Sequence, residues 1–408
     1  DAKIAFFDLV QGNDFLIPPS DYRDIFIPLH TLAGARIHSA SWGQPYDNEY
    51  GIDSHNIDAF VHDYPNDLVL FAAGNQGSFG ITQESNCKNC LSVGASCGYL
   101  GANDGLVDWS SVGPTSDGRI KPDVVAPGSN IGSVGAGVQD SSSQTCATTI
   151  SSGTSFSTPF IAGISALLRQ YLQQGRLNGY GIVNPSAALM KALLINSGEM
   201  LTKLYSEDCS TQLPGENLNP GPFSRPDMKQ GFGAVKLNNI IPLDGEYNTF
   251  IYDNVSITTG FLYAFTFTVT NDTMDLRATL TWIDPPGVLG SSKQVLNDLD
   301  LSIILPNGTV VFPNYGHGPD RINNVERLIV PKALLIVGTK QTLRVSGTLI
   351  MNSPQSFALA ITGQISGNIS VPTATVFTAS PTSNPTVSPT HAPTRTRSPS
   401  IAEIGNTA

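Results

Sequence analysis

The hydrophobic and polar positions of this chain follow two different patterns, which meet near residue 245. Up to about residue 200, short apolar runs at 35–38, 68–72 and 91–95 alternate with helix-like segments. The run 68–72 is nearly continuous in apolar residues, which is typical of a strand buried on both faces. This alternation predicts a parallel sheet with helices on its faces.

Two segments carry helical periodicity. Asp53 and Ser54 precede apolar residues at helical spacing, as expected for a capped crossover helix that leads into the 68–72 strand. From Thr154 to Tyr171 apolar residues recur on several sides, with Pro159 tolerated near the first turn. We therefore expect the 154–171 helix to be buried.

After residue 245 the pattern changes to short alternating strands, such as 263–270 and 277–282. Turn signals at 284–287 and 306–308 separate them, which indicates an all-β sandwich or jelly roll ending near Ile361. Residues 371–400 contain eight Thr, six Pro and five Ser, a composition typical of disordered segments. The predicted domains are therefore an α/β domain (1–245), a β-sandwich (246–365) and a disordered tail (366–408).

Composition excludes several function classes. The net charge of −11 provides no positive field for nucleic acid. Apolar runs fall well short of the ~20 residues that cross a bilayer, so we expect no membrane span. Charged residues make up only 13% of the chain, against about 25% in an ordinary domain, so Ser, Thr, Asn and Gly must cover much of its surface.

The five cysteines, at 87, 90, 97, 146 and 209, bear on the compartment. Cys87 and Cys90 have the CxxC spacing of a zinc site, but no second pair completes one. We expect instead two disulfides among Cys87, Cys90, Cys97 and Cys146. Four N-glycosylation acceptor sequences also favour a secretory or extracellular protein; they begin at Asn254, Asn271, Asn307 and Asn368.

The segment Ser152-Gly153-Thr154-Ser155-Phe156-Ser157-Thr158-Pro159 joins a glycine turn to the 154–171 helix. A serine hydroxyl at a helix N-terminus lies where backbone N–H groups and the helix dipole favour developing negative charge, which suits a nucleophile. The alternative is that Thr154 or Ser155 is an N-cap residue.

Together with Ile161-Ala162-Gly163, this segment resembles the nucleophile signature of the subtilisin-like serine peptidases. Three further segments match that family in order: Ser39-Ala40-Ser41-Trp42-Gly43, Ala72-Ala73-Gly74-Asn75, and the run from Asp117 to Gly128. The resemblance implies that Ser155 is the nucleophile and that Asn75 donates to the oxyanion. It also implies that Ser41, Trp42, Gly43, Ala73 and Gly74 bind the substrate peptide and form the walls of a specificity pocket. Taken without the resemblance, Asn75 is a turn residue after a strand. The segments 41–43 and 72–74 could equally be ordinary sheet edge, and Trp42 a packing residue.

The second domain extends the resemblance. Leu296-Asn297-Asp298-Leu299-Asp300-Leu301, Pro306-Asn307-Gly308-Thr309 and Asn323-Asn324-Val325-Glu326 resemble the C-terminal β-sandwich of the oxidatively stable alkaline protease branch of the family. Asn297, Asp298 and Asp300 supply oxygen ligands that a structural calcium ion would need. Asx turns and strand-edge charges explain the same residues, and we expect no cofactor to be required.

The family's catalytic His and Asp motifs, His-Gly-Thr-His and Asp-[Ser/Thr]-Gly, do not occur in the chain. Asp1-Ala2-Lys3-Ile4-Ala5 resembles the strand that follows the family's His helix. We therefore expect an α/β domain that is incomplete at its N-terminus, from a monomeric serine endopeptidase acting on proteins or peptides, and inactive in this form. The alternative is a secreted, non-catalytic binding or adhesion protein on a degenerate protease scaffold.

Overall fold

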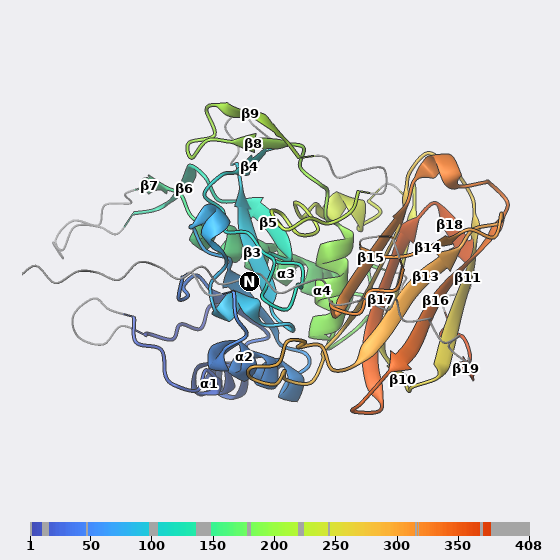
Figure 1. Cartoon of the computed structure of the whole chain (residues 1–408), viewed down its shortest axis with the longest axis horizontal. Helices are drawn as coiled ribbons and strands as arrows, with labels where there is room; N and C mark the ends of the chain where they lie inside the picture. The colour runs from blue at the N-terminus through green and yellow to red at the C-terminus, as the bar shows by residue number, and fades with distance from the viewer. Residues whose placement is uncertain are drawn as a thin grey trace, which may run out of the picture. The chain divides into compact units, whose positions relative to one another are not determined.

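A sheet of seven strands, most of them paired in parallel, forms the α/β part of the fold (Figure 1). The computed structural model describes residues 2–9, 16–45, 48–97, 105–135, 148–177, 181–218, 224–243, 245–314, 316, 318–367 and 370–376. The strands of the sheet are β1 (Ile37–Ala40), β2 (Leu68–Ala72), β3 (Leu91–Ser96), β4 (Gly105–Val107), β5 (Val124–Pro127), β8 (Lys203–Tyr205) and β9 (Gln212–Asn217). Its order is β1-β2-β3-β4-β8-β9, and β5 pairs with β3. The predicted α/β class is confirmed.

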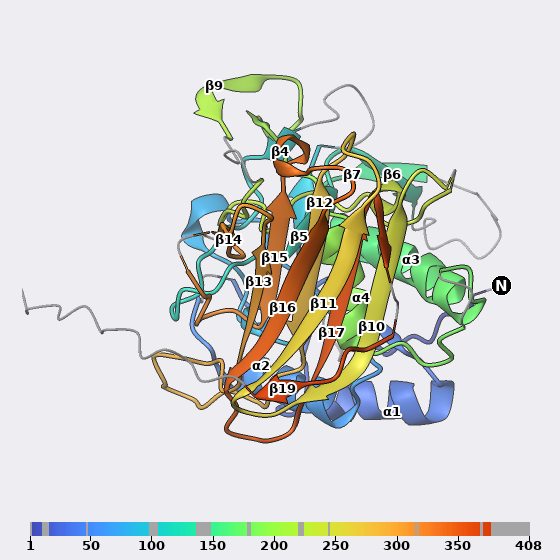
Figure 2. The same cartoon turned by 90° about the vertical axis from the view of Figure 1, so that its right-hand side faces the viewer.

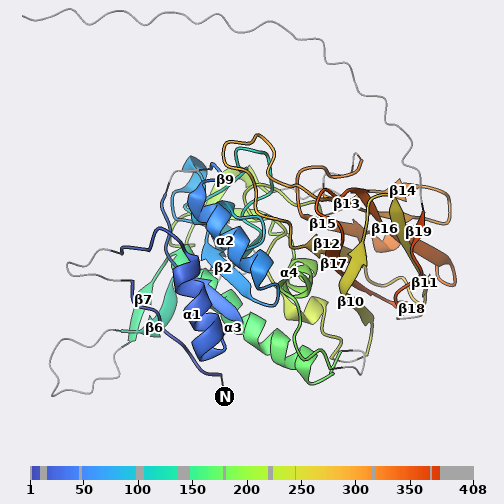
Figure 3. The same cartoon turned by 90° about the horizontal axis from the view of Figure 1, so that it is seen from below.

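Alternating side chains of β2 build a core on each face of this sheet. Val69 and Phe71 pack against α1 (Arg23–Ala33) and α2 (Ile52–Asp63). Leu68 and Leu70 pack on the other side with α3 (Thr154–Gln173) and α4 (Ala187–Asn196), and Figure 3 shows the four helices from below. Both faces of the strand are covered, which explains its continuous apolar run.

The other short elements connect these layers. Strands β6 (Ile131–Val134) and β7 (Thr148–Ser151) form a separate antiparallel pair whose second strand leads into α3. Single turns of 3₁₀ helix lie at η1 (Gly77–Phe79), η2 (Glu84–Asn86), η3 (Leu237–Asn239) and η4 (Lys332–Leu334).

Two antiparallel sheets form the β-sandwich that the alternating pattern predicts (Figure 2). One has the order β10-β17-β12-β15, and the other β14-β13-β16-β11-β18, with β19 paired to β11. The strands are β10 (Asn248–Ile257), β11 (Phe261–Val269), β12 (Leu276–Trp282), β13 (Asp298–Ile304), β14 (Val310–Val311), β15 (Val325–Val330), β16 (Lys340–Leu349), β17 (Gln355–Gly363), β18 (Ile365–Gly367) and β19 (Thr375–Val376). In β11 the side chains of Phe265, Phe267 and Val269 alternate into the core between the sheets.

Helix α4 lies between the parallel sheet and the sandwich (Figure 1). All its residues are buried, because it packs on both β2 and the sandwich strands β12 and β17. Its polar side chains, Lys191 and Asn196, are hydrogen-bonded within this interior. Residues Asp1–Phe377 accordingly form one compact unit. The predicted tail, 366–408, falls largely outside the described residues.

Three sequence expectations are wrong in part. Helix α3 is not fully buried, because Phe160 and Leu167 on one face are 49% and 62% exposed. Helix α2 has Gly51 at its N-cap, and the Ser54 hydroxyl donates to Gln83 O instead of capping the helix. Residues 2–9 form no strand, although the first five resemble one in the family.

The disulfide prediction also needs correction. Cys87 pairs with Cys90, as the predicted set allows, but Cys97 pairs with Cys209. The reason is topological: β8 pairs in parallel with β4, and the Cys97 N–H bonds to Gly105 O, so the turn after β8 lies beside Cys97. Cys146 lies outside the described residues. Because Cys87 and Cys90 bond each other, they are not zinc ligands.

Candidate active site

The site forms at the junction between Gly153 and α3. Gly153 has φ +154° and ψ 154°, a conformation that side-chain-bearing residues rarely adopt. A methyl group added there would lie 3.4 Å from Asn75 Nδ2 and 3.6 Å from Ser155 N. Two nitrogen atoms therefore lie close to one point beside Gly153, at the positive end of a 20-residue helix.

Asn75 follows β2 at the carboxyl end of the sheet and is exposed. Its Oδ1 accepts hydrogen bonds from the Thr154 backbone N at 2.8 Å and from Thr154 Oγ1 at 2.9 Å. Because two donors occupy Oδ1, the amide is oriented with Nδ2 away from Thr154. The side chain of Asn75 thus caps α3 from a different segment and presents its N–H₂ group beside Ser155.

Ser155 and Ser41 exchange hydrogen bonds. Ser155 Oγ donates to Ser41 O at 3.1 Å, and Ser41 Oγ donates to Ser155 O at 2.8 Å. Ser155 is half-buried, and its hydroxyl faces the extended segment that follows β1. The Ser155 hydroxyl therefore donates its hydrogen to the Ser41 carbonyl oxygen. A carbonyl oxygen cannot take up the proton as a general base would.

Two segments, 41–43 and 73–74, flank the Thr154–Ser155 pair, and we call them the flanking segments. The backbone of the second is fully bonded within the protein: Ala73 pairs with Val93 and Thr82, and Gly74 with Thr154 Oγ1 and Ser111. The N–H groups of Ala73 and Gly74 are therefore already bonded, and only their carbonyl oxygens could accept a further hydrogen bond. Trp42 lies in that first segment, but its ring packs edge-on against Tyr22 and Phe71.

The four described histidines bond elsewhere. His30 Nδ1 and His38 Nε2 both lie 2.9 Å from Asp67 Oδ2, at the opposite end of the strands. His55 Nδ1 lies 2.9 Å from Gly287 O, and His62 lies beside Asp63. Within the part of the chain that the structure describes, no histidine reaches Ser155.

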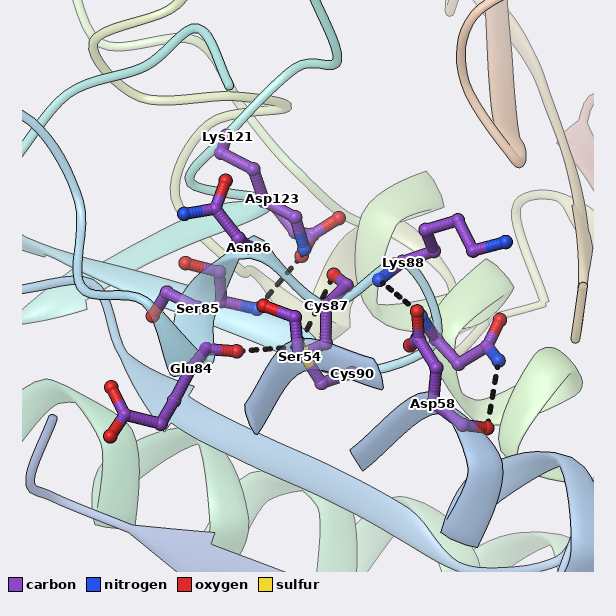
Figure 4. The surroundings of a disulfide bond; sticks show 12 residues. Ser54, Asp58, Glu84, Ser85, Asn86, Cys87, Lys88, Cys90, Lys121 and Asp123 are labelled. Carbon is purple, nitrogen blue, oxygen red and sulfur yellow. Dashed lines mark hydrogen bonds and ion pairs between the residues drawn. A yellow bond between two sulfur atoms is a disulfide. The ribbon is translucent and has the colours of Figure 1, made fainter. Parts of the chain in front are cut away.

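A loop closed by Cys87–Cys90 follows the second flanking segment in the chain, and Figure 4 shows the surroundings of its disulfide. At its start, Glu84 Oε2 accepts from Gln44 N at 2.8 Å and Oε1 accepts from Tyr22 OH at 2.9 Å. Burial of this carboxyl raises its pKa. At its tip, the Asp58 carboxylate accepts from the backbone N–H groups between the two cysteines.

The candidate calcium ligands have protein partners. Asp298 and Asp300 both pair with Arg321, and Asn297 Oδ1 accepts from two backbone N–H groups. Among the described residues, no three His, Cys, Asp or Glu side chains are grouped so as to hold a metal ion. As arranged here these oxygens do not fit a calcium site, and the ion stays an untested prediction.

Sequence reasoning missed the residues that orient the site. Thr154 links Asn75 to Gly74, and Glu84 holds the first flanking segment. The signal for Thr154 was its place in the Gly-Thr-Ser motif, next to the expected nucleophile. No local pattern distinguishes Glu84, because its partners are 40 and 62 residues away in the sequence.

Comparison with known proteins identifies the family. The model of the subtilase family matches residues 9–233, more than half of the chain. The serine protease/ABC transporter B family protein tagB of Dictyostelium discoideum is 27% identical over 494 residues, which cover 89% of this chain and 25% of the relative. This chain therefore spans about a quarter of that relative's length.

Other matches are more local. The PII-type proteinase of Lactococcus lactis subsp. cremoris is 33% identical over 153 residues, covering 37% of this chain and 7% of the relative. The solved structure of the prenylagaramide maturation protease PagA is 22% identical with a TM-score of 0.40, covering 56% of this chain and 68% of that one.

Proposed function

Because the chain belongs to the subtilase family, we propose that it is the nucleophile-bearing part of a serine endopeptidase that cleaves peptide bonds through an acyl-enzyme on Ser155. One observation carries this proposal: Asn75 Nδ2 and Ser155 N lie 3.4 and 3.6 Å from one point beside Gly153, at the N-terminus of α3. Donors that point at a common space are what an oxyanion needs.

In the proposed reaction Ser155 Oγ bonds to the carbonyl carbon of the substrate, and the serine proton passes to a base. The carbonyl oxygen becomes an oxyanion that accepts from Asn75 Nδ2 and Ser155 N. The C–N bond then breaks, the amine leaves with the proton, and water hydrolyses the acyl-enzyme by the same steps. Protein side chains and water supply every group, so no cofactor is required.

The base is the group that the described residues do not supply. We propose that polypeptide outside these 408 residues carries the His and Asp, and that the chain alone is inactive. Two surfaces support this. The outer edge of β1 has no strand partner within the described ranges, and α3 exposes Phe160 in its second turn and Leu167 two turns further on. A segment that covers the edge of β1 and Phe160 would pass near the nucleophile.

Secretion is part of the proposal. Disulfides such as Cys97–Cys209 persist in oxidising compartments. The acceptor residues Asn254, Asn271 and Asn307 all lie exposed on the sandwich, whereas Asn368 falls outside the described residues. In the described part of the chain, no helix combines the length and apolar character needed to cross a bilayer. We propose an extracellular, N-glycosylated monomer that acts on proteins or peptides.

Titration with a peptide boronic acid tests the site without a base. Ser155 Oγ bonds to boron and releases its proton to the solvent. The product is a tetrahedral boron adduct, which ¹¹B NMR detects. We expect Ser155→Ala to abolish the adduct and Asn75→Ala to weaken it about 100-fold. An adduct insensitive to both changes would overturn the proposal.

Two further measurements separate the alternatives. Peptide binding that is independent of Ser155 would favour the non-catalytic binding protein. Peptide hydrolysis by these 408 residues that Ser155→Ala abolishes would show that this chain supplies its own base. In that case the proposed outside source of His and Asp would be wrong.

A further inference from the structure

Asn254, the first residue of an N-glycosylation acceptor sequence, lines a cavity of about 230 Å³ where the α/β part meets the sandwich. The lining comes from α2, α4, β10, β17 and the turns beside them, and includes His62, Pro65, Ser186, Ile283, Asn352 and Phe357. We propose that this cavity binds the first N-acetylglucosamine of a glycan attached to Asn254. The inference rests on the proposed secretion and N-glycosylation of the chain, and is independent of its peptidase activity.

A bulge in β10 fixes the position of Asn254. The register between β10 and β17 shifts between Tyr252 and Val255, which leaves residues 253 and 254 outside it. Asn254 is exposed and has φ +55°, a left-handed conformation that asparagine tolerates better than most residues. The carboxylate of Asp253 accepts from Ser186 N at 3.0 Å and from Ser186 Oγ at 2.5 Å. Because Ser186 is the N-cap of α4, the bulge is attached to that helix, and the acceptor asparagine is held beside the cavity.

The chemistry of the lining fits a neutral sugar. Ile283, Pro285 and Phe357 supply apolar surface, which can cover the C–H face of a pyranose ring and the methyl group of its acetamide. Polar side chains at exposed positions can bond to the hydroxyl and amide groups; they are His62, Asn352 and Ser356. Apolar surface with a few polar groups is typical of small-ligand sites. Among the described residues that line the cavity there is no Asp, Glu, Lys or Arg, so the lining does not favour an ionic ligand.

Covalent attachment makes this binding intramolecular. In the attachment step Asn254 Nδ2 bonds to C1 of the first sugar of a lipid-diphosphate oligosaccharide. The C1–O bond to the diphosphate breaks, the lipid diphosphate leaves, and Nδ2 loses one proton. A short tether gives an effective concentration in the range of about 1 mM or above, so contacts too weak to hold a free sugar suffice. A bound sugar would contact α2 and the sandwich together, and would stabilise their junction only in the folded chain.

Release of glycans by peptide N-glycosidase tests the proposal on the chain secreted from a eukaryotic host. The enzyme converts each released site to aspartate, which mass spectrometry quantifies peptide by peptide. Asn271 and Asn307 are internal references, since each lies in a turn where its Oδ1 accepts a nearby backbone N–H. In the native chain we expect release from Asn254 to be about tenfold slower than from these two, because the bound sugar must first leave the cavity. In the denatured chain the three rates should be alike.

Filling the cavity should remove this protection. Ser356 is exposed and lines the cavity, so Ser356→Trp should bring the rate at Asn254 to that of the reference sites without changing its occupancy. The control is Thr266→Trp, at an exposed position of β11 in the other sheet, which should leave Asn254 protected.

Thermal unfolding gives a second readout. Ser256→Ala removes the acceptor sequence but keeps Asn254, and should lower the unfolding midpoint by about 2 °C. Ser256→Thr, which keeps the acceptor sequence, should not. Thr273→Ala removes the acceptor sequence of Asn271 in the same way and should leave the midpoint unchanged.

The outcomes separate this inference from the proposals on which it rests. Equal rates of release at the three sites of the native chain would overturn the inference and leave N-glycosylation intact. Protection that persists in Ser356→Trp would overturn it too, since the glycan would then be shielded elsewhere. A chain modified at Asn271 or Asn307 but not at Asn254 contradicts this inference alone, whereas a secreted chain modified at none of the three also contradicts the proposed N-glycosylation.

Discussion

Ser41 Oγ donates a hydrogen bond to Ser155 O at 2.8 Å, and this carbonyl is available because of a proline one turn later. In an α-helix the carbonyl of residue 155 would accept from the N–H of residue 159. That residue is Pro159, which has no N–H group. The serine of the first flanking segment thus takes the place of the missing helical hydrogen bond and ties that segment to the nucleophile.

A double-mutant cycle between Ser41 and Pro159 tests this relationship. Ser41→Ala leaves the Ser155 carbonyl without its partner and should lower the free energy of unfolding by about 1 kcal/mol. In a Pro159→Ala background a backbone N–H can bond that carbonyl, so the same change should cost less than half as much. Urea denaturation measures both values. Ser39→Ala, an exposed serine two residues earlier, is the control, and equal costs in the two backgrounds would contradict the explanation.

Asn75 should have separable roles in stability and binding. Asn75→Ala removes the acceptor for Thr154 N and Oγ1 and should destabilise the chain by about 1–2 kcal/mol, as loss of a helix cap does. Asn75→Asp keeps both acceptors and places a negative charge at the helix N-terminus, so its stability should lie within about 0.5 kcal/mol of wild type. Thermal and urea unfolding measure this difference.

The same aspartate substitution removes the Nδ2 donor. Asn75→Asp should therefore bind a peptide boronic acid about 100-fold more weakly despite its near-normal stability. An Asn75→Asp chain that is as unstable as Asn75→Ala would show that Oδ1 does not cap α3. A stable chain with unchanged boronate affinity would show that Nδ2 is not a donor to the adduct.

A buried ion pair joins the two parts of the compact unit. Lys88 Nζ donates to Asp284 Oδ2, and also to Pro285 O and Gln294 O at 2.6 and 2.7 Å. Both charged side chains are 0% exposed. Lys88→Met leaves the Asp284 charge buried without its partner and should lower the unfolding free energy by about 3–5 kcal/mol.

The control for Lys88→Met is Lys236→Met, because Lys236 pairs with Glu199 on the surface, at 36% and 49% exposure. Its cost should stay below about 1 kcal/mol. Adding Asp284→Asn to Lys88→Met should recover part of the loss, since no uncompensated charge then remains. Similar costs for the buried and the exposed lysine would show that the interface is not held by this pair.

The sequence predicted those features of the fold that depend on local periodicity. The continuous run of β2 and the alternation in β11 each follow from which faces are covered. Phe160 and Leu167 led to a wrong expectation for α3, since an apolar residue predicts burial only where a neighbouring element covers it. The Gly-Thr-Ser motif likewise predicted the position of Ser155 at the start of α3, but not the direction of its hydroxyl.

Contacts between residues far apart in the sequence could not be predicted from local sequence patterns. Cys97 pairs with Cys209, 112 residues away, because β4 and β8 are neighbours in the sheet, and nothing in the spacing of the cysteines encodes that neighbourhood. Glu84 is similar: its role comes from contacts with Tyr22 and Gln44, which the fold alone brings together.

The two described disulfides should contribute unequally to stability. A cross-link restricts the unfolded chain more when it closes a longer loop, and Cys97–Cys209 spans 112 residues against three for Cys87–Cys90. Replacing Cys97 and Cys209 by serine should cost about 3 kcal/mol more than replacing Cys87 and Cys90. Urea denaturation of the two double variants under non-reducing conditions measures the difference. Equal costs would mean that effects in the folded state outweigh loop closure.

Asp298 should make the sandwich less stable as the pH rises. Burial, with the nearby charge of Asp300, raises the pKa of Asp298 to about 6, from 3.8 in an unfolded chain. Between these values the folded state binds more protons than the unfolded state, so unfolding free energy falls as the pH rises from about 4 to 6. One pKa unit corresponds to about 1.4 kcal/mol, so this residue accounts for up to about 3 kcal/mol.

Asp298→Asn cannot ionise and should remove this part of the pH dependence, while Arg321 keeps both of its hydrogen bonds to Asp300. The variant should be close to wild type at pH 4 and about 2–3 kcal/mol more stable at pH 7, as measured by urea denaturation across that range. Asp272→Asn, at an exposed position, is the control and should show no pH-dependent gain. If Asp298→Asn loses stability uniformly at every pH, the Arg321 pair outweighs the cost of burying the second carboxylate, and the sign argued here is wrong.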